Sequence, residues 1–105
     1  MKAEAYRELK VLEELSTNPS VTQRYLANSL QVALGLTNLM IRRLVKKGFV
    51  KVVTTSRIRI RYLLTPTGIS EKSRLTYEYM EYSLHLYREV RHVLTSSLAP
   101  LARAN

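Results

Sequence analysis

The chain contains no cysteine, no tryptophan and no aspartate, and only three glycines, three prolines and one phenylalanine among 105 residues. The absence of cysteine excludes disulfides, thiolate catalysis and cysteine-bound zinc. No apolar run approaches the roughly 18 residues of a membrane span, and the glutamate-rich start lacks the basic and apolar regions of a signal peptide. A chain of this length forms one domain with a modest core. We therefore expect one cytoplasmic domain.

The residues that enzymes use are scarce as well. There is no glycine-rich phosphate loop, and the two histidines fall on one outer helix face without a plausible nucleophile beside them. His85, Glu89 and His92 lie one and two helical turns apart, which would allow a metal site. Because Glu81 and Arg88 flank them, an ordinary solvated polar face is favoured. We expect no enzyme, no cofactor and no metal.

Positive charge is concentrated in one interval. The formal net charge is +9, from seventeen lysines and arginines against eight glutamates. No acid occurs between Glu14 and Glu71, whereas nine basic residues do, and the remaining eight bases balance the eight acids. A merely soluble basic surface would intersperse the two signs. The segregated charge therefore indicates a polyanionic partner that faces this interval.

Three helices are expected in the first half of the chain. Residues 3–15 form an amphipathic helix with Tyr6, Leu9, Leu12 and Leu15 on its apolar stripe. A breaker cluster follows, and a short helix opens near Thr22, although Ser20 and Gln23 also fit a capping box, which leaves its start open. Residues 33–47 form the central helix. Two short helices joined by a tight turn make a helix-turn-helix.

The central helix is expected to have a core face and a partner face. Its inward side carries Leu34, Thr37, Met40, Ile41, Leu44 and Val45. Its outward side carries Gly35, Leu39, Arg42, Arg43 and Lys46, with Asn38 near the boundary. Lys46 and Lys47 followed by Gly48 predict its end, because cations suit the negative end of a helix and glycine accepts a left-handed turn.

A hairpin is expected next. Residues 49–53 are rich in β-branched side chains, residues 54–56 form a polar turn, and residues 57–64 return. Alternation along the returning strand puts Arg57, Arg59 and Arg61 on one face. The other face, with Ile58, Ile60 and Tyr62, should cover the helices.

The last element is expected to be a long helix that begins with Thr65 as N-cap and Pro66 at its first position and ends near Leu94. A narrow polar sector leaves more apolar surface than one small domain can bury, which predicts a homodimer. The alternative is a helix folded wholly onto its own domain. The candidate interface residues are Leu75, Tyr79, Tyr82, Leu86, Val90 and Val93. The expected organisation is therefore residues 1–65 for partner binding, 66–95 for dimerisation, and 96–105 as a flexible tail.

Four segments carry a family resemblance that spans most of residues 6–94. They are QRYLA at 23–27, LVKKGFVKV at 44–52, YLLTPTG at 62–68 and EKSRLT at 71–76. The sequence resembles winged helix-turn-helix regulators, and specifically the small exopolysaccharide-associated MarR-type transcriptional regulators. It departs from the family where Gln31 replaces a usual glycine and Ala33 a usual capping serine. Leu36 and Leu39 stand where many relatives carry polar or aromatic groups.

The resemblance implies a mainly α fold with a small β-hairpin (α+β), a winged helix-turn-helix followed by a long dimerisation helix. It also implies that residues 33–47 are the recognition helix and Thr54–Arg57 the wing tip. The helix would enter the major groove of double-stranded DNA. The expected base contacts are Asn38, Leu39, Arg42 and Arg43, and the expected backbone contacts are Arg24, Lys46, Lys47, Arg57, Arg59 and Arg61.

Other interpretations stay open at the level of sequence. The same fold could coat DNA without preference as an architectural protein. The basic surface could instead bind an acidic protein as an interaction adaptor. Leu39 could contact thymine methyl groups or be a single exposed leucine. A small-molecule effector, the operator and the direction of regulation are not specified by these residues.

Overall fold

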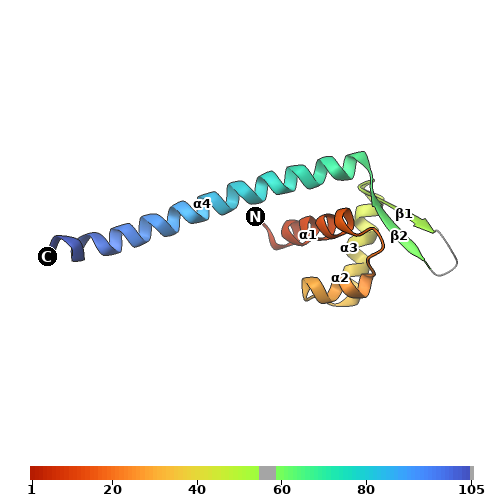
Figure 1. Cartoon of the computed structure of the whole chain (residues 1–105), viewed down its shortest axis with the longest axis horizontal. Coiled ribbons are helices and arrows are strands. Elements are labelled where there is room, and N and C mark those ends of the chain that lie inside the picture. Colours follow the sequence, from red (N-terminus) through yellow and green to blue (C-terminus); the bar gives the residue numbers. More distant parts are fainter. Residues whose placement is uncertain (55–58, 105) are drawn as a thin grey trace.

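The computed structural model describes residues 1–54 and 59–104, with side chains as far as Leu98. The elements follow in the order α1 (Ala3–Thr17), α2 (Gln23–Leu30), α3 (Leu34–Lys46), β1 (Val50–Thr54), β2 (Ile60–Leu64) and α4 (Pro66–Ala104). Helices α1 to α3 gather around the base of the hairpin, and α4 passes over α1 and continues beyond it (Figure 1). This is the expected mainly α fold with a small β-hairpin and a long last helix.

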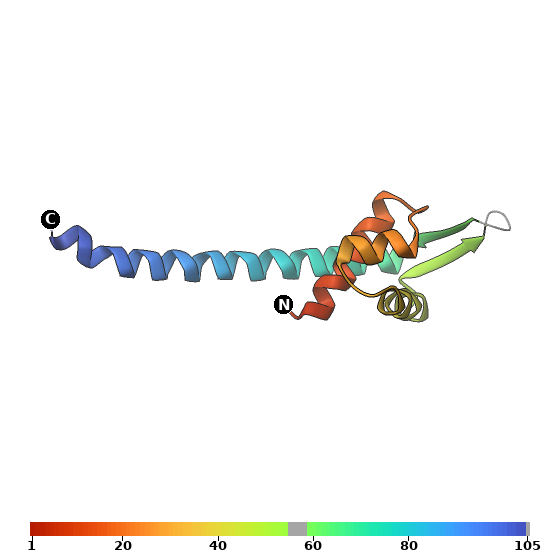
Figure 2. The ribbon, with the colours of Figure 1, turned by 90° about the horizontal axis from the view of Figure 1, so that it is seen from below.

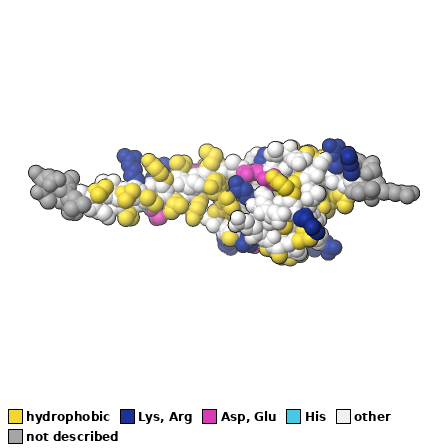
Figure 3. Space-filling model, turned by 60° about the horizontal axis from the view of Figure 1, so that its bottom comes forward, with side chains coloured by type: hydrophobic (Ala, Val, Ile, Leu, Met, Phe, Trp, Pro, Cys, Tyr) yellow, Lys and Arg dark blue, Asp and Glu magenta, His cyan; other side chains and the backbone are white. Residues whose placement is uncertain are grey.

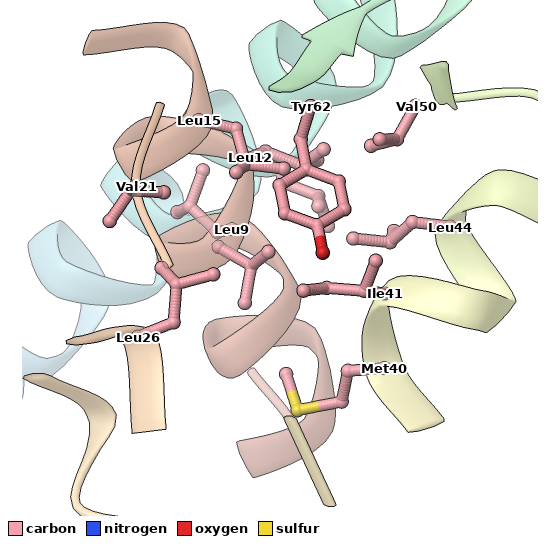
Figure 4. Packing of buried hydrophobic residues seen from close by; sticks show 12 residues of the cluster. Leu9, Leu12, Leu15, Val21, Leu26, Met40, Ile41, Leu44, Val50 and Tyr62 are labelled. Carbon is pink, nitrogen blue, oxygen red and sulfur yellow. The ribbon is translucent and has the colours of Figure 1, made fainter. Parts of the chain in front are cut away.

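The core forms around the inner face of α1. Leu9, Val11, Leu12 and Leu15 are buried there. The ring of Tyr62 from β2 lies beside Leu12 and Leu15 (Figure 4). The cluster is completed from the other elements and from the loop before α2 by Val21, Leu26, Met40, Ile41, Leu44, Val50 and Leu75. Tyr6, expected on the buried stripe, is instead 39% exposed and packs on Tyr79 with ring centroids 5.6 Å apart.

Helix α2 begins after Thr22, whose hydroxyl accepts a hydrogen bond from the Tyr25 backbone N–H at 3.1 Å. Thr22 is therefore the N-cap, and the open question of its start is resolved. In the turn to α3, Gln31 takes a left-handed conformation with φ 56°. This is the position where the family resemblance leads one to expect glycine, which adopts that conformation without steric cost. Ala33 precedes α3 and offers no side-chain cap.

Helix α3 ends as expected. The Phe49 N–H donates to the Leu44 carbonyl at 2.9 Å and the Gly48 N–H to the Val45 carbonyl at 3.0 Å, while Gly48 has φ +83°. These two bonds are those of a Schellman motif, which satisfies the last carbonyls of a helix. The turn directs the chain straight into β1, so the hairpin starts beside the end of α3.

Two residues of α3 correct the expected inward face. Leu34 is 46% and Val45 is 38% exposed. The middle of the buried face is occupied by Thr37, which is fully buried and donates its hydroxyl to the Ala33 carbonyl. Leu36 packs against the core on the side toward α1. The buried arc is therefore rotated toward α1 from the expected one, so that Leu36 rather than Leu34 or Val45 borders the core.

The hairpin is antiparallel, with Val52 paired with Tyr62 and Val50 with Leu64. Its apolar face covers the helices only near its base, where Val50 and Tyr62 are buried. Ile60 is 51% exposed, which corrects the expectation that it would cover the helices, because the strands project past the helical body (Figure 2). Strand β2 starts at Ile60 rather than at residue 57. Arg57 and Ile58 lie outside the described residues.

Helix α4 starts as expected, with the Thr65 hydroxyl accepting from the Gly68 N–H at 3.0 Å and Pro66 as first helical residue. It ends at Ala104 rather than near Leu94. Extending an existing helix costs little compared with nucleating one, which favours its continuation through residues 95–99. Within the described residues, no helix is long and apolar enough to cross a membrane.

Candidate nucleic-acid interface

The outer face of α3 presents Leu39, Arg42 and Lys46 on successive helical turns. All three are exposed, and Leu39 is 43% exposed. Neither Arg42 nor Lys46 takes part in the ion pairs found among the described residues. Two cations and an apolar side chain on a convex helix make a surface suited to base edges and phosphates.

Arg43 and Lys47 lie on a different flank, which faces α1. Arg43 Nη1 is 3.3 Å from Glu4 Oε1, and Lys47 Nζ is 3.6 Å from Glu8 Oε1. The structure therefore separates these two predicted DNA contacts from Asn38, Leu39, Arg42 and Lys46. The sequence held a signal for this pairing. Glu4 and Glu8 are four residues apart, as are Arg43 and Lys47, so each pair lies on one face of its helix and the two faces can meet.

An open groove separates α3 from the hairpin. It is lined by Gln23, Ile41, Arg42, Val45, Lys46, Val52, Ile60 and Tyr62. Val45 and Ile60, the residues expected inside, give this groove part of its apolar floor. Arg42 and Lys46 stand on its α3 side, so a strand of polyanion that follows the groove would meet cations and apolar surface together.

A second groove lies between β2 and the start of α2. Its lining is Ser20, Val21, Thr22, Gln23, Arg59, Ile60, Arg61 and Tyr62. Arg59 and Arg61 are exposed, and the Arg61 Nε–H donates to the Ser20 hydroxyl at 3.4 Å. Arg24 is the second residue of α2 and is exposed. These are three of the predicted backbone contacts, and Arg57 lies outside the described residues.

Gln23 lies between the two grooves and was not identified from the sequence. Its Nε2 donates to the Tyr62 hydroxyl at 3.0 Å, and its Oε1 accepts from Asn38 Nδ2 at 3.1 Å. One amide thus joins α2, β2 and α3. The partners are 39 and 15 residues away along the chain, so no local pattern could have paired them. The one hint in the sequence was Tyr62 on the apolar face of its strand, because the hydroxyl of a buried tyrosine needs a partner.

The family comparison agrees with this arrangement. Residues 5–51 match the model described as "Winged helix-turn-helix DNA-binding". The structure is similar to that of MepR, a transcription regulator of the Staphylococcus aureus multidrug efflux pump MepA, with TM-score 0.67 and 19% identity over 99% of this chain and 79% of that one. The chain has the winged helix-turn-helix fold of MarR-family transcription regulators. Helices α2 and α3 are its helix-turn-helix, and β1 and β2 its wing.

Two further MarR-family structures share the fold. The S. aureus MepR–DNA complex matches with TM-score 0.66 and 21% identity, covering 96% of this chain and 79% of that one. A Mycobacterium tuberculosis MarR family protein in complex with p-aminosalicylic acid matches with TM-score 0.69 and 21% identity, covering 91% and 77%. No curated protein matches the chain. The resemblance to MarR-type regulators is thus confirmed for the fold, and the exopolysaccharide-associated subfamily stays a prediction.

Proposed function

We propose that this chain is a sequence-specific, DNA-binding transcription regulator that acts as a homodimer on cytoplasmic DNA. The observation that carries the proposal is the outer face of α3, where exposed Leu39, Arg42 and Lys46 lie beside a basic wing in an interval without acids. The MepR–DNA complex supports it, because a protein of the same fold binds DNA. The α3 helix would lie in the major groove, which accommodates one helix.

The structure allows a division of roles among the predicted contacts. Asn38, Leu39 and Arg42 are proposed to meet base edges, since amide and guanidinium groups can make two-point contacts with adenine and guanine. Lys46, Arg24, Arg59 and Arg61 are proposed to contact phosphates, as is Arg57. Arg43 and Lys47, which face Glu4 and Glu8, are left out of the base-reading set.

The homodimer is supported by the apolar stripe of α4. Leu75 is 1% exposed because it packs in the core of its own chain, so it is removed from the predicted interface. Beyond Leu75, an apolar residue recurs every three or four positions and so stays on one face of α4. These residues are 38 to 60% exposed, and they are Tyr79, Tyr82, Leu86, Val90 and Val93. Hydrophobic side chains run along this exposed helix (Figure 3). A second copy would cover them, and inverted half-sites about 10 base pairs apart would follow.

The deciding experiment is a fluorescence-anisotropy titration against a randomised duplex pool and against a duplex enriched from that pool by the protein, over a salt series. A preference of roughly a thousandfold or more for the enriched duplex supports a specific regulator. Equal, salt-sensitive affinity for every duplex would mean an architectural role. No binding at low salt would favour the interaction adaptor and contradict the proposal.

Arg59→Ala provides a check on the backbone role. The exposed Arg59 borders the groove between β2 and α2. Removing one phosphate contact should lower the affinity for every duplex by the same factor. It should also reduce the slope of log affinity against log salt concentration by about 1. A change in the order of preferred sequences would contradict a backbone role for Arg59.

A further inference from the structure

Gln23 makes a second hydrogen bond beyond the one that it makes to the Tyr62 hydroxyl. Tyr62 is 6% exposed, and its ring lies in the core (Figure 4), so its hydroxyl needs a hydrogen-bond partner. The Gln23 Nε2 donor supplies that partner at 3.0 Å. The other end of the same amide, Oε1, holds Asn38 Nδ2 at 3.1 Å. Anchoring Tyr62 alone leaves this second bond unexplained.

We propose that Gln23 is a positioning residue that sets the base preference of the regulator by fixing the amide of Asn38. The inference rests on the proposed function. An asparagine amide carries two N–H donors and one carbonyl acceptor. Since Gln23 Oε1 can only accept, it must face the Asn38 nitrogen and takes one of its two N–H groups. The second N–H and Oδ1 remain for a ligand.

The remaining donor and acceptor match the edge of one base. Adenine presents N7 as an acceptor and its N6 amino group as a donor in the major groove, and asparagine pairs with both. If the Asn38 amide rotated freely, it would present its donor and acceptor in either order, and its preference for adenine would be weaker. Gln23 is itself held at both ends, by Tyr62 in the core and by Asn38, so it can transmit the rigidity of the core to α3.

The test uses the duplex that the full-length protein enriches from a randomised pool, and a panel in which each base pair is changed singly. Gln23→Leu keeps the size of the side chain and removes both hydrogen bonds. Preference at one base pair should fall by about 5- to 150-fold, the range of one two-point base contact. Affinity for an unrelated duplex should not change, and circular dichroism reports whether the fold is intact.

The double variant separates positioning from direct contact. Asn38→Leu should lose preference at the same base pair, and Gln23→Leu with Asn38→Leu should lose no more than Asn38→Leu alone. Gln23→Glu is the conservative rescue, because a carboxylate still accepts from Asn38 while the Tyr62 hydroxyl can turn to donate. Its added negative charge should weaken all duplexes equally and leave the relative preference at that base pair unchanged.

Each result decides between the proposals. Three results would overturn the role of Gln23 and leave the proposed regulator intact. Gln23→Leu could lower the affinity for every duplex by the same factor, or leave the base preference unchanged. The losses of preference in the double variant could also be additive. If the unaltered protein shows no preference for any duplex, the proposed function fails and the role of Gln23 fails with it.

Discussion

The segment from Leu64 to Gly68 shows what single residues contribute. The Thr65 backbone N–H donates to the Phe49 carbonyl at 3.1 Å, and its hydroxyl caps α4 while also donating to the Gly48 carbonyl. Gly68 faces that same Phe49 carbonyl, and a Cβ built on it would lie 2.0 Å from the oxygen. Thr65 and Gly68 thus hold the start of α4 against the turn that follows α3.

Gly68→Ala is therefore expected to lower the free energy of unfolding by about 1–3 kcal/mol, the usual cost of overpacking, because a backbone carbonyl must shift. Urea denaturation at one fixed protein concentration measures it. The matched control is Gly35→Ala in α3, where a Cβ would meet nothing within 4 Å. This change should raise stability by about 0.5–1 kcal/mol, since alanine is the better helix former. Equal effects of both variants would contradict the close approach at Gly68.

At the scale of one element, α3 has three sides rather than two. One side is buried, a second faces α1 with Arg43 and Lys47 opposite Glu4 and Glu8, and a third is open toward the groove and solvent. The Arg43–Glu4 pair is exposed on both sides and contributes little to stability, whereas Glu8 is largely buried beneath Lys47. The two pairs mainly change the electrostatic potential around α3. Two acids of α1 offset two cations of α3, so Arg42 and Lys46 dominate the potential on its outer side.

Arg42→Ala and Arg43→Ala test this asymmetry on neighbouring residues of one helix. Arg42→Ala should reduce the free-energy preference for one base over the others at one base pair by about 1–3 kcal/mol, because it removes a side chain proposed to contact a base. Arg43→Ala should leave the sequence preference unchanged and weaken binding only slightly. Anisotropy titrations against the panel of singly changed duplexes measure both. A loss of preference with Arg43→Ala as large as with Arg42→Ala would contradict the assignment.

The whole molecule measures 72 × 26 × 19 Å, far longer than it is thick. Its length comes from α4, which packs on α1 through its first turns and then runs free of the compact part (Figures 1 and 2). Apolar side chains line the free stretch, whereas the core of the chain is already closed around α1. A single copy thus leaves its largest exposed apolar surface on the element that projects from it.

Leu86→Glu is expected to convert a dimer into a monomer. Leu86 is 46% exposed and lies on the free stretch, so its change should spare the fold while placing a charge in each half of a symmetric interface. Light scattering after size-exclusion chromatography should give a mass near 12.1 kDa instead of twice that value. Arg88→Glu, in the polar sector, is the control and should stay dimeric. A monomeric unaltered protein would refute the homodimer.

Features that depend on near neighbours in the chain could be predicted from the sequence. The Gly48 stop of α3, the Thr65 and Pro66 start of α4, the hairpin and the acid-free interval all follow from residues a few positions apart, because capping, turn formation and strand alternation are local. The tertiary structure decided the rest. The α1-facing flank of α3, the burial of Leu75, the exposure of Val45 and the link from Gln23 to Asn38 and Tyr62 depend on how elements dock. Docking brings together residues as far apart along the chain as Tyr6 and Tyr79, and no local pattern specifies which of several apolar arcs the core will use.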